Sequence, residues 1–430
     1  MEPQESQHEK RNLSILFGQR ALATMGWTMA NPAVVLPYLA ISLDVPVFLA
    51  GLLVSLRRSA NLGVAVLGAD FAAARINKKA DISVTDFVLA LCYVLAVASV
   101  ISNSTIVVTV MFIVIVLLIG LTEEYQNLIS WDFLADTLQS ENRQRLMYTA
   151  MGIGGIGAIV FAWSAHFVMK EYPPLARHST VIAIAVICFC VSAVSILLVR
   201  EWKQQTDSTD PKPGGRSRLQ ASREAVASFF SSLRHLLSMP WFRRYVLIRM
   251  ALQNVELSVP FFAILAAISH GASQKGLTAL IISSAAALVI AGPVWRFVGR
   301  ISNGAVMAGG AIMAALAGVV LIVNHYVQWA DVTVVHSLTL FAVTVGVQGV
   351  SSARALYYMD IAPKEYRVSG LAVSKSVVRV AGIILAAFMA ALAHMQHVTW
   401  AIALVAILNV CTAIFVFSVS GKPAHDVKPA

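Results

Sequence analysis

The stretch from Ile106 to Phe133, IVVTVMFIVIVLLIGLTEEYQNLISWDF, joins a long apolar run to a group of charged and polar residues. An α-helix needs about 20 residues to cross the roughly 30 Å hydrocarbon core of a bilayer. The apolar run ends at Ile119 and is shorter than that, so a crossing helix must carry Glu123 and Glu124 into the membrane. A charge near the bilayer centre costs about 3 kcal/mol or more, so these glutamates need a partner or a function.

The composition of the whole chain agrees with a membrane setting. Hydrophobic residues make up 58% of the 430 residues and charged residues only 13%, whereas soluble domains are roughly 25% charged. All four cysteines lie inside apolar runs rather than in loops: Cys92, Cys188, Cys190 and Cys411. This placement favours packing residues over a disulfide framework or a zinc site. The predicted fold class is an all-α polytopic membrane protein, with no metal and no cofactor expected.

The apolar segments predict twelve transmembrane helices. They cover residues 14–42, 46–72, 82–102, 105–135, 147–169, 179–199, 245–269, 276–298, 303–325, 333–360, 368–394 and 398–418. An even number of crossings puts both termini on one side, where most of the loop lysines and arginines also gather. The other side has only Lys170, Arg177 and Lys275 in its loops. The positive-inside rule therefore predicts cytoplasmic termini, and the short loops favour a bacterial inner membrane.

One connection divides the chain. It contains the Pro/Gly/Ser-rich sequence KQQTDSTDPKPGGRSR, followed by LQASREAVASFFSSLRHLL, whose apolar spacing is typical of a short amphipathic helix on a membrane surface. We therefore expect an N-terminal six-helix bundle over 1–200, a cytoplasmic linker over 201–242 with a possible amphipathic helix, and a C-terminal six-helix bundle over 243–430. The net charge of +10 follows from loop charges in this topology, so no nucleic-acid partner is expected.

The two halves look like copies of each other. The first span reads RALATMGWTMANPAVVLPYLAI and the seventh reads RMALQNVELSVPFFAILAAI, each beginning with an arginine, Arg20 or Arg249, and carrying a later proline. The ends of spans four and ten also correspond: each has an aspartate, Asp132 or Asp360, followed by a polar turn with arginine and a span rich in small residues. Two related six-helix halves, arranged as pseudo-symmetric bundles, are typical of a transporter built from parallel repeats.

The turns after spans two and eight resemble the signature Gly-x-x-x-Asp-Arg-x-Gly-Arg-Arg of the major facilitator superfamily, and the resemblance covers essentially the whole chain. The turn DFAAARINKK retains the basic pair Lys78 and Lys79. The turn GPVWRFVGRI retains Gly299 and Arg300 but has Arg296 in place of the aspartate of the family. Both copies are degenerate, so they support the fold better than any particular salt bridge of a gate. The resemblance implies alternating access of two bundles around a site at the membrane midplane.

Seven side chains inside the predicted spans are candidates for binding the solute or a coupling ion: Arg57, Arg58, Glu123, Glu124, Asn127, Glu256 and Arg379. Successive residues of a helix point about 100° apart, so the two arginines of span two and the two glutamates of span four cannot all face one cavity. We expect an ion pair between these two clusters. The remaining glutamate could exchange a proton against the solute, because burial and a nearby cation shift its proton affinity in opposite directions.

A second group of charges lies at the expected cytoplasmic ends of the helices and is predicted to close a gate there: Asp132, Arg143, Arg145, Arg300, Asp360 and Arg367. Asp132 and Asp360 occupy matching places in the two halves. Opposite charges at helix ends can hold the two bundles together on one side of the membrane.

The predicted function is secondary active transport of a small polar or charged solute, coupled to protons. The excess of basic groups inside the spans slightly favours an anion, with Arg379 as a candidate to bind it. Alternatives are a metal cation or cationic organic solute, which the acidic cluster from Glu123 to Asp132 would suit, and a non-transporting sensor acting through the 201–242 linker.

The expected partners are the small-molecule or ion substrate and membrane lipid, and a monomer is expected although the sequence sets no oligomeric state. With no nucleophile beside a base and no phosphate loop, an enzyme is not expected.

Overall fold

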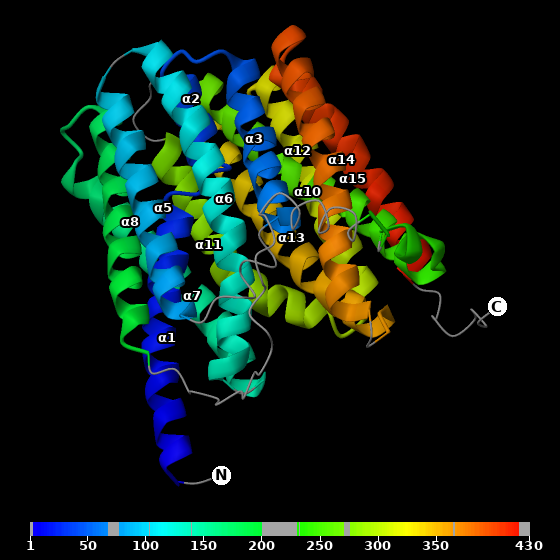
Figure 1. Ribbon diagram of the computed structural model, residues 1–430. Helices are drawn as coiled ribbons and strands as arrows, with labels where there is room; N and C mark the ends of the chain where they lie inside the picture. The colour runs from blue at the N-terminus through cyan, green and yellow to red at the C-terminus, as the bar shows by residue number, and fades with distance from the viewer. Residues whose placement is uncertain are drawn as a thin grey trace.

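The chain forms a bundle of long helices (Figure 1). The computed structural model describes residues 3–67, 77–102, 104–138, 140–199, 230–231, 233–270, 276–363 and 366–420; within these ranges it leaves undescribed the side chains of 3–10, 131–132, 135–136, 140–141, 143–145, 147–148, 174–175, 367–369 and 420. The helices of the first half are α1 (Pro3–Met29), α2 (Val35–Ser42), α3 (Val47–Leu67), α5 (Lys78–Ile101), α6 (Thr105–Thr137), α7 (Ser140–Val168) and α8 (Pro174–Leu197). Those of the second half are α10 (Pro240–His270), α11 (Gly276–Val298), α12 (Asn303–Val327), α13 (Val332–Ile361), α14 (Arg367–Met395) and α15 (Val398–Ser420).

Among the described helices, 11 are long and apolar enough to cross a membrane. The broken pair α1 and α2 makes a further crossing, because the interruption between them divides its apolar run. The predicted all-α membrane fold of two six-helix bundles is confirmed. We call the end of the bundle at which α1 begins and α15 ends the inner end, and the opposite end the outer end. Most of the predicted 201–242 linker lies outside the described residues, and α10 begins at Pro240, three residues before the predicted start of the second half.

The interruption of the first crossing follows from Asn31 and Pro32. Proline has no backbone N–H, and its ring clashes with the preceding turn of a helix. At Pro32 the helix is interrupted, so polar backbone groups are freed at membrane depth, where protein must satisfy them. The Tyr93 hydroxyl donates to the Ala30 carbonyl at 2.5 Å, and the Ala33 N–H donates to the Asn31 Oδ1 atom at 2.9 Å. Asn31 and Pro32 thus divide the predicted span 14–42 into α1 and α2.

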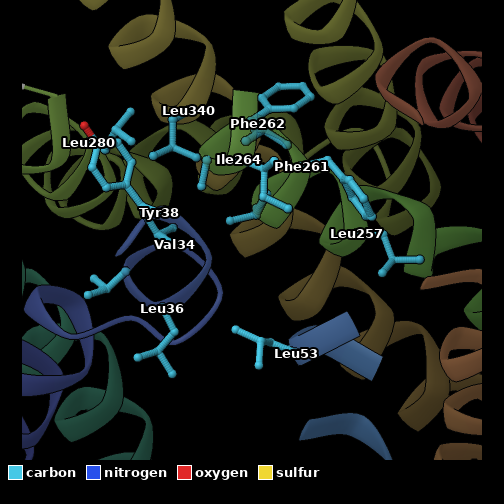
Figure 2. Packing of buried hydrophobic residues seen from close by; sticks show 14 of the residues in the cluster. Val34, Leu36, Tyr38, Leu53, Leu257, Phe261, Phe262, Ile264, Leu280 and Leu340 are labelled. Carbon is cyan, nitrogen blue, oxygen red and sulfur yellow. The ribbon is translucent and has the colours of Figure 1, made fainter. Parts of the chain in front are cut away.

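The two halves meet along three seams, in which α3 packs on α14, α7 on α11 and α2 on α10. At the outer end the seam is formed by buried apolar side chains. Figure 2 shows Val34 and Tyr38 of the first half beside Ile264 and Leu280 of the second. All four are at most 2% exposed and belong to one cluster that spans both halves.

At the inner end, the apolar contacts do not cross between the halves in the same way. One cluster there joins α1, α5, α6, α7 and α8 of the first half, with Phe133 as its largest buried side chain. A second cluster joins α10 and α14 of the second half around Phe242. The halves are thus sealed together at the outer end and packed separately at the inner end.

Close packing of α3 against α6 depends on Gly120. A Cβ atom on Gly120 would lie 2.5 Å from the Arg57 carbonyl oxygen and 2.8 Å from the Ala60 Cβ. Helices in lipid associate through such close contacts of small residues rather than through a hydrophobic driving force. Gly120→Ala is therefore expected to lower the free energy of unfolding by about 1–3 kcal/mol, measured by thermal unfolding of the purified protein in detergent. Gly63→Ala is the control, because nothing lies within 4 Å of that position; equal destabilisation by both variants would contradict the prediction.

Candidate functional site

A cavity of about 630 Å³ lies between the two halves, a size typical of small-molecule sites. Its wall is formed by α1, α3, α6 and α7 of the first half and by α11 and α13 of the second. The polar residues of the wall are Arg20, Thr24, Thr28, Asn31, Arg57, Glu123, Gln126, Asn127, Ser130, Ser284, Thr344, Gln348 and Ser351. Of the predicted binding residues, Arg57, Glu123 and Asn127 line this cavity.

Several polar atoms of the wall are buried without a hydrogen-bond partner. They are Arg20 Nε, Ser130 Oγ, Ser284 Oγ and Glu123 Oε2, the last of which forms no hydrogen bond but lies 3.4 Å from Arg57 Nε. An unsatisfied buried polar group costs about 1–3 kcal/mol, and each such group in a folded protein calls for an explanation, such as a ligand or water that satisfies it. Ser130 belongs to the first half and Ser284 to the second, so a solute that contacts both hydroxyls would bridge the halves. The sequence analysis assigned neither serine to the site, because serine is common in membrane helices without any role in binding.

The ion pair expected between spans two and four is present in the first half. Arg57 Nε lies 3.4 Å from Glu123 Oε2, and both side chains are 25% exposed. Both residues also line the cavity, so their charges are accessible to a solute there. Glu123 is the glutamate that faces the cavity.

The neighbouring arginine has a different partner. Arg58 Nη2 lies 3.6 Å from Glu256 Oε2, and Arg354 Nη1 lies 3.2 Å from Glu256 Oε1. Arg58 belongs to α3 of the first half, whereas Glu256 and Arg354 belong to α10 and α13 of the second. Glu256 therefore binds one arginine from each half.

A second ion pair also crosses between the halves. Arg379 of α14 donates to Glu124 of α6, and it donates further to the Asn61 carbonyl of α3 at 3.3 Å. The Glu124 side chain is only 3% exposed. In this conformation, Arg379 is occupied by Glu124 rather than open to a solute, which differs from its predicted place as an anion-binding group facing the cavity. Glu124, for its part, is turned away from the cavity wall.

Sequence reasoning missed Asp86, which the fold places at the centre of a polar network in the first half. Its side chain is fully buried. It accepts hydrogen bonds from Gln126 Nε2 at 2.5 Å, from Ser192 Oγ at 2.6 Å and from Gln19 Nε2 at 3.4 Å. The signal was available, because a carboxylate inside any predicted span is a candidate by itself. Asp86 escaped notice because it stands near the start of the predicted span 82–102, where a charged helix end is ordinary.

The predicted gate is only partly within the described residues. Asp360 accepts a hydrogen bond from Asn303 Nδ2 at 3.1 Å, and Arg300 lies over the Phe297 ring at 6.0 Å. Both are exposed, and among the described residues they do not pair with each other. The side chains of the other predicted gate residues lie outside the described residues: Asp132, Arg143, Arg145 and Arg367.

Two six-helix bundles around a central polar cavity, sealed at one end, define the class of secondary transporters. A family model described as Major Facilitator Superfamily matches residues 16–386, and the chain belongs to this family. Family and fold together point to transport rather than to catalysis.

Solved structures of the same fold include the inward open xylose transporter XylE from E. coli. It has a TM-score of 0.65 and 13% identity, with 94% of this chain and 95% of that chain covered. A partially occluded inward open form of XylE from E. coli gives a TM-score of 0.67 and 13% identity, with 97% and 100% covered. The POT family transporter PepTSo gives 0.64 and 12%, with 95% and 97% covered. At these identities the likeness shows the fold alone.

Among curated proteins, the chain is similar to uncharacterized proteins of Mycobacterium tuberculosis and Mycobacterium bovis. Each is 27% identical over 179 residues, which is 41% of this chain and 34% of the relative. The match thus spans about a third of the length of these relatives.

Proposed function

We propose that this protein transports a small anionic solute through the central cavity by alternating access, coupled to protons. The observation that carries the proposal is the Arg20 guanidinium, which lines the cavity and whose Nε atom is buried without a hydrogen-bond partner. The other arginine of the wall, Arg57, already faces Glu123. An anionic group of the solute would supply the missing acceptor to Arg20, and the Ser130 and Ser284 hydroxyls would bind its polar atoms.

Glu123 supports the proton coupling. Its carboxylate lines the cavity, and its Oε2 atom accepts no hydrogen bond. Because this carboxylate lies 3.4 Å from Arg57, a solute that approaches or displaces Arg57 also changes the charge around Glu123. The fold is compatible with such coupling, since one similar structure, at a TM-score of 0.67 and 11% identity, is a D-xylose-proton symporter.

A metal cation or cationic organic solute is the second candidate, favoured by the acidic cluster that begins at Glu123. Glu123 is the acid of that cluster that lines the cavity. Glu124 is bound to Arg379, and the Asp132 side chain lies outside the described residues. The described part of the chain holds no group of three or more metal-ligating His, Cys, Asp or Glu side chains. The sensor alternative depends on the 201–242 linker, most of which also lies outside the described residues.

The proposal includes the setting of the protein. The inner end, with both termini, would face the cytoplasm, and the membrane would be a bacterial inner membrane in which the protein is a monomer. The loop charges support the orientation.

The test is the thermal unfolding of the detergent-purified protein with acetate, succinate, citrate or phosphate, and in parallel with divalent metal ions and tetraalkylammonium ions. A ligand at about 100 times its dissociation constant stabilises the folded state by about 2.7 kcal/mol. We expect stabilisation by at least one of these anions, loss of that stabilisation in Arg20→Gln, and its retention in Arg300→Gln, which removes an exposed arginine outside the cavity.

Two results would overturn the anion proposal. Stabilisation by cations alone, abolished by Glu123→Gln, would replace it with the cation alternative. No stabilisation by any compound, together with no uptake of the same anions into proteoliposomes, would favour the sensor alternative.

A further inference from the structure

Asp86 lies on the inner half of α5, and its carboxylate is surrounded by donors from three other helices. Gln19 of α1, Gln126 of α6 and Ser192 of α8 all direct N–H or O–H groups at it. An ionised carboxylate only accepts hydrogen bonds, whereas a protonated one also donates. The arrangement in this inward-facing state therefore suits the ionised form of Asp86.

Arg20, a positively charged residue of the cavity wall, directly follows Gln19, which donates to the Asp86 carboxylate. Among the described residues, the charged group that acts on Asp86 is Arg20, and Arg20 itself lines the cavity. Gln126 also connects Asp86 with the cavity, since its amide donates to Asp86 and its side chain forms part of the cavity wall. The repeat-related arginine of the second half, Arg249, donates instead to the Tyr245 hydroxyl and to Ser374 Oγ, both at 3.2 Å. Arg249 also acts on an acid of its own half, Glu256, but Arg249 does not line the cavity, whereas Arg20 does.

We infer that Asp86 is a proton-binding site of this transporter and that Arg20 controls its occupancy from the cavity wall. The inference rests on the proposed transport of an anion. An anionic group bound to Arg20 competes with Asp86 for the same positive charge. A buried carboxylate that loses its counter-charge is neutralised by binding a proton.

The exchange balances in charge and in hydrogen bonds. One proton from water binds one oxygen of the Asp86 carboxylate as one negative charge of the solute binds Arg20. The two added charges cancel, so the net charge of the site is unchanged. The new Asp86 O–H group needs an acceptor. Ser192 Oγ can turn from donor to acceptor, because a hydroxyl has two lone pairs. An anion would then move with one proton.

Infrared difference spectroscopy of the full-length protein in bilayers tests the inference without a transported solute. At neutral pH, Arg20→Gln is expected to show the C=O stretching band of a protonated carboxyl group that the wild type lacks. The band should vanish in Arg20→Gln/Asp86→Asn and remain in Arg20→Gln/Glu123→Gln, which separates Asp86 from the cavity glutamate. Arg20→Lys keeps the positive charge and should resemble the wild type.

Two results would overturn the inference: no such band in folded Arg20→Gln, or a band that disappears with the Glu123 substitution instead of the Asp86 substitution. If Arg20→Gln does not fold, the infrared spectrum of the acidified wild-type protein is measured instead. The carboxyl band gained on acidification must then shrink in Asp86→Asn, and an unchanged band would count against Asp86.

Perfusion of wild type with succinate or phosphate separates this inference from the proposed function. Any of these anions that stabilises the protein should also induce the Asp86 band, and a stabilising anion that leaves Asp86 ionised would overturn the control by Arg20. If no anion stabilises the protein while the variants behave as expected, the proposed anion transport fails and the Asp86 proton site stands.

Discussion

Replacing Glu256 by glutamine is expected to lower the free energy of unfolding by about 3 kcal/mol, because two buried arginines lose their shared counter-charge. Arg58 and Arg354 lie 3.6 and 3.2 Å from the two oxygens of Glu256, and their side chains are only 15% and 16% exposed. The estimate is taken at the low end of the range for buried pairs, since 31% of the Glu256 side chain is exposed. Thermal unfolding in detergent measures the loss.

Two further variants isolate the cause of this loss. Glu123→Gln removes a carboxylate that faces a single arginine, with both side chains 25% exposed, so it should destabilise the protein less. The double variant Glu256→Gln/Arg58→Gln removes one of the stranded charges and should recover part of the lost stability. If Glu256→Gln unfolds at the wild-type temperature, the three-residue network does not hold the halves together.

Arg379→Gln is expected to shift the transporter toward its outward-facing state and to reduce transport about tenfold. The Arg379–Glu124 ion pair ties α14 of the second half to α6 of the first, and the carboxylate is 3% exposed. A contact made in one state and lost in the other sets the balance between them, and couplings of this kind are typically worth 1–3 kcal/mol, or about 5- to 150-fold. Lys375 also acts on Glu124, so part of the attraction remains.

The population shift can be measured at the outer seal. In a background without the four native cysteines, Leu280→Cys should react slowly with a membrane-impermeant maleimide, because Leu280 is 2% exposed and lies beside Tyr38 of the other half (Figure 2). Adding Arg379→Gln should accelerate the reaction. The matched control is Arg57→Gln, whose ion pair with Glu123 lies within the first half. Equal acceleration by the two arginine variants would mean that the inter-half pair has no special part in closing the seal.

Most of the fold could be predicted from the sequence, because a helix that inserts into a membrane must meet simple requirements of length and composition. A crossing must be apolar for about 20 residues and must satisfy its own backbone, so helix positions can be predicted from hydropathy alone. The predicted span 333–360 corresponds to α13, Val332–Ile361, whereas the predicted span 14–42 is divided at Asn31 and Pro32 into α1 and α2. The family followed from the repeat of two halves and from the basic turns. The boundaries were less well determined: α7 begins at Ser140, seven residues before the predicted span, because polar residues can extend a helix beyond the bilayer.

What the sequence could not supply was the partner of each charge. It showed that the arginines of span two and the glutamates of spans four and seven needed counter-charges. It predicted an ion pair between the span-two arginines and the span-four glutamates, and the structure forms it between Arg57 and Glu123. Neighbouring residues on a helix point about 100° apart, so Arg57 faces its own half while Arg58 reaches Glu256 in the other. That difference depends on how α3 packs against α10 and α14.

The charges and the apolar lengths are properties of the chain. They determined that this protein spans a membrane as two bundles with charged side chains inside. Which charged side chains pair, and which of them face the cavity, was decided only when helices far apart in sequence packed together. Arg20 shows this most clearly: its place at the start of span one is visible in the sequence, but its position between Asp86 and the cavity exists only in the folded bundle.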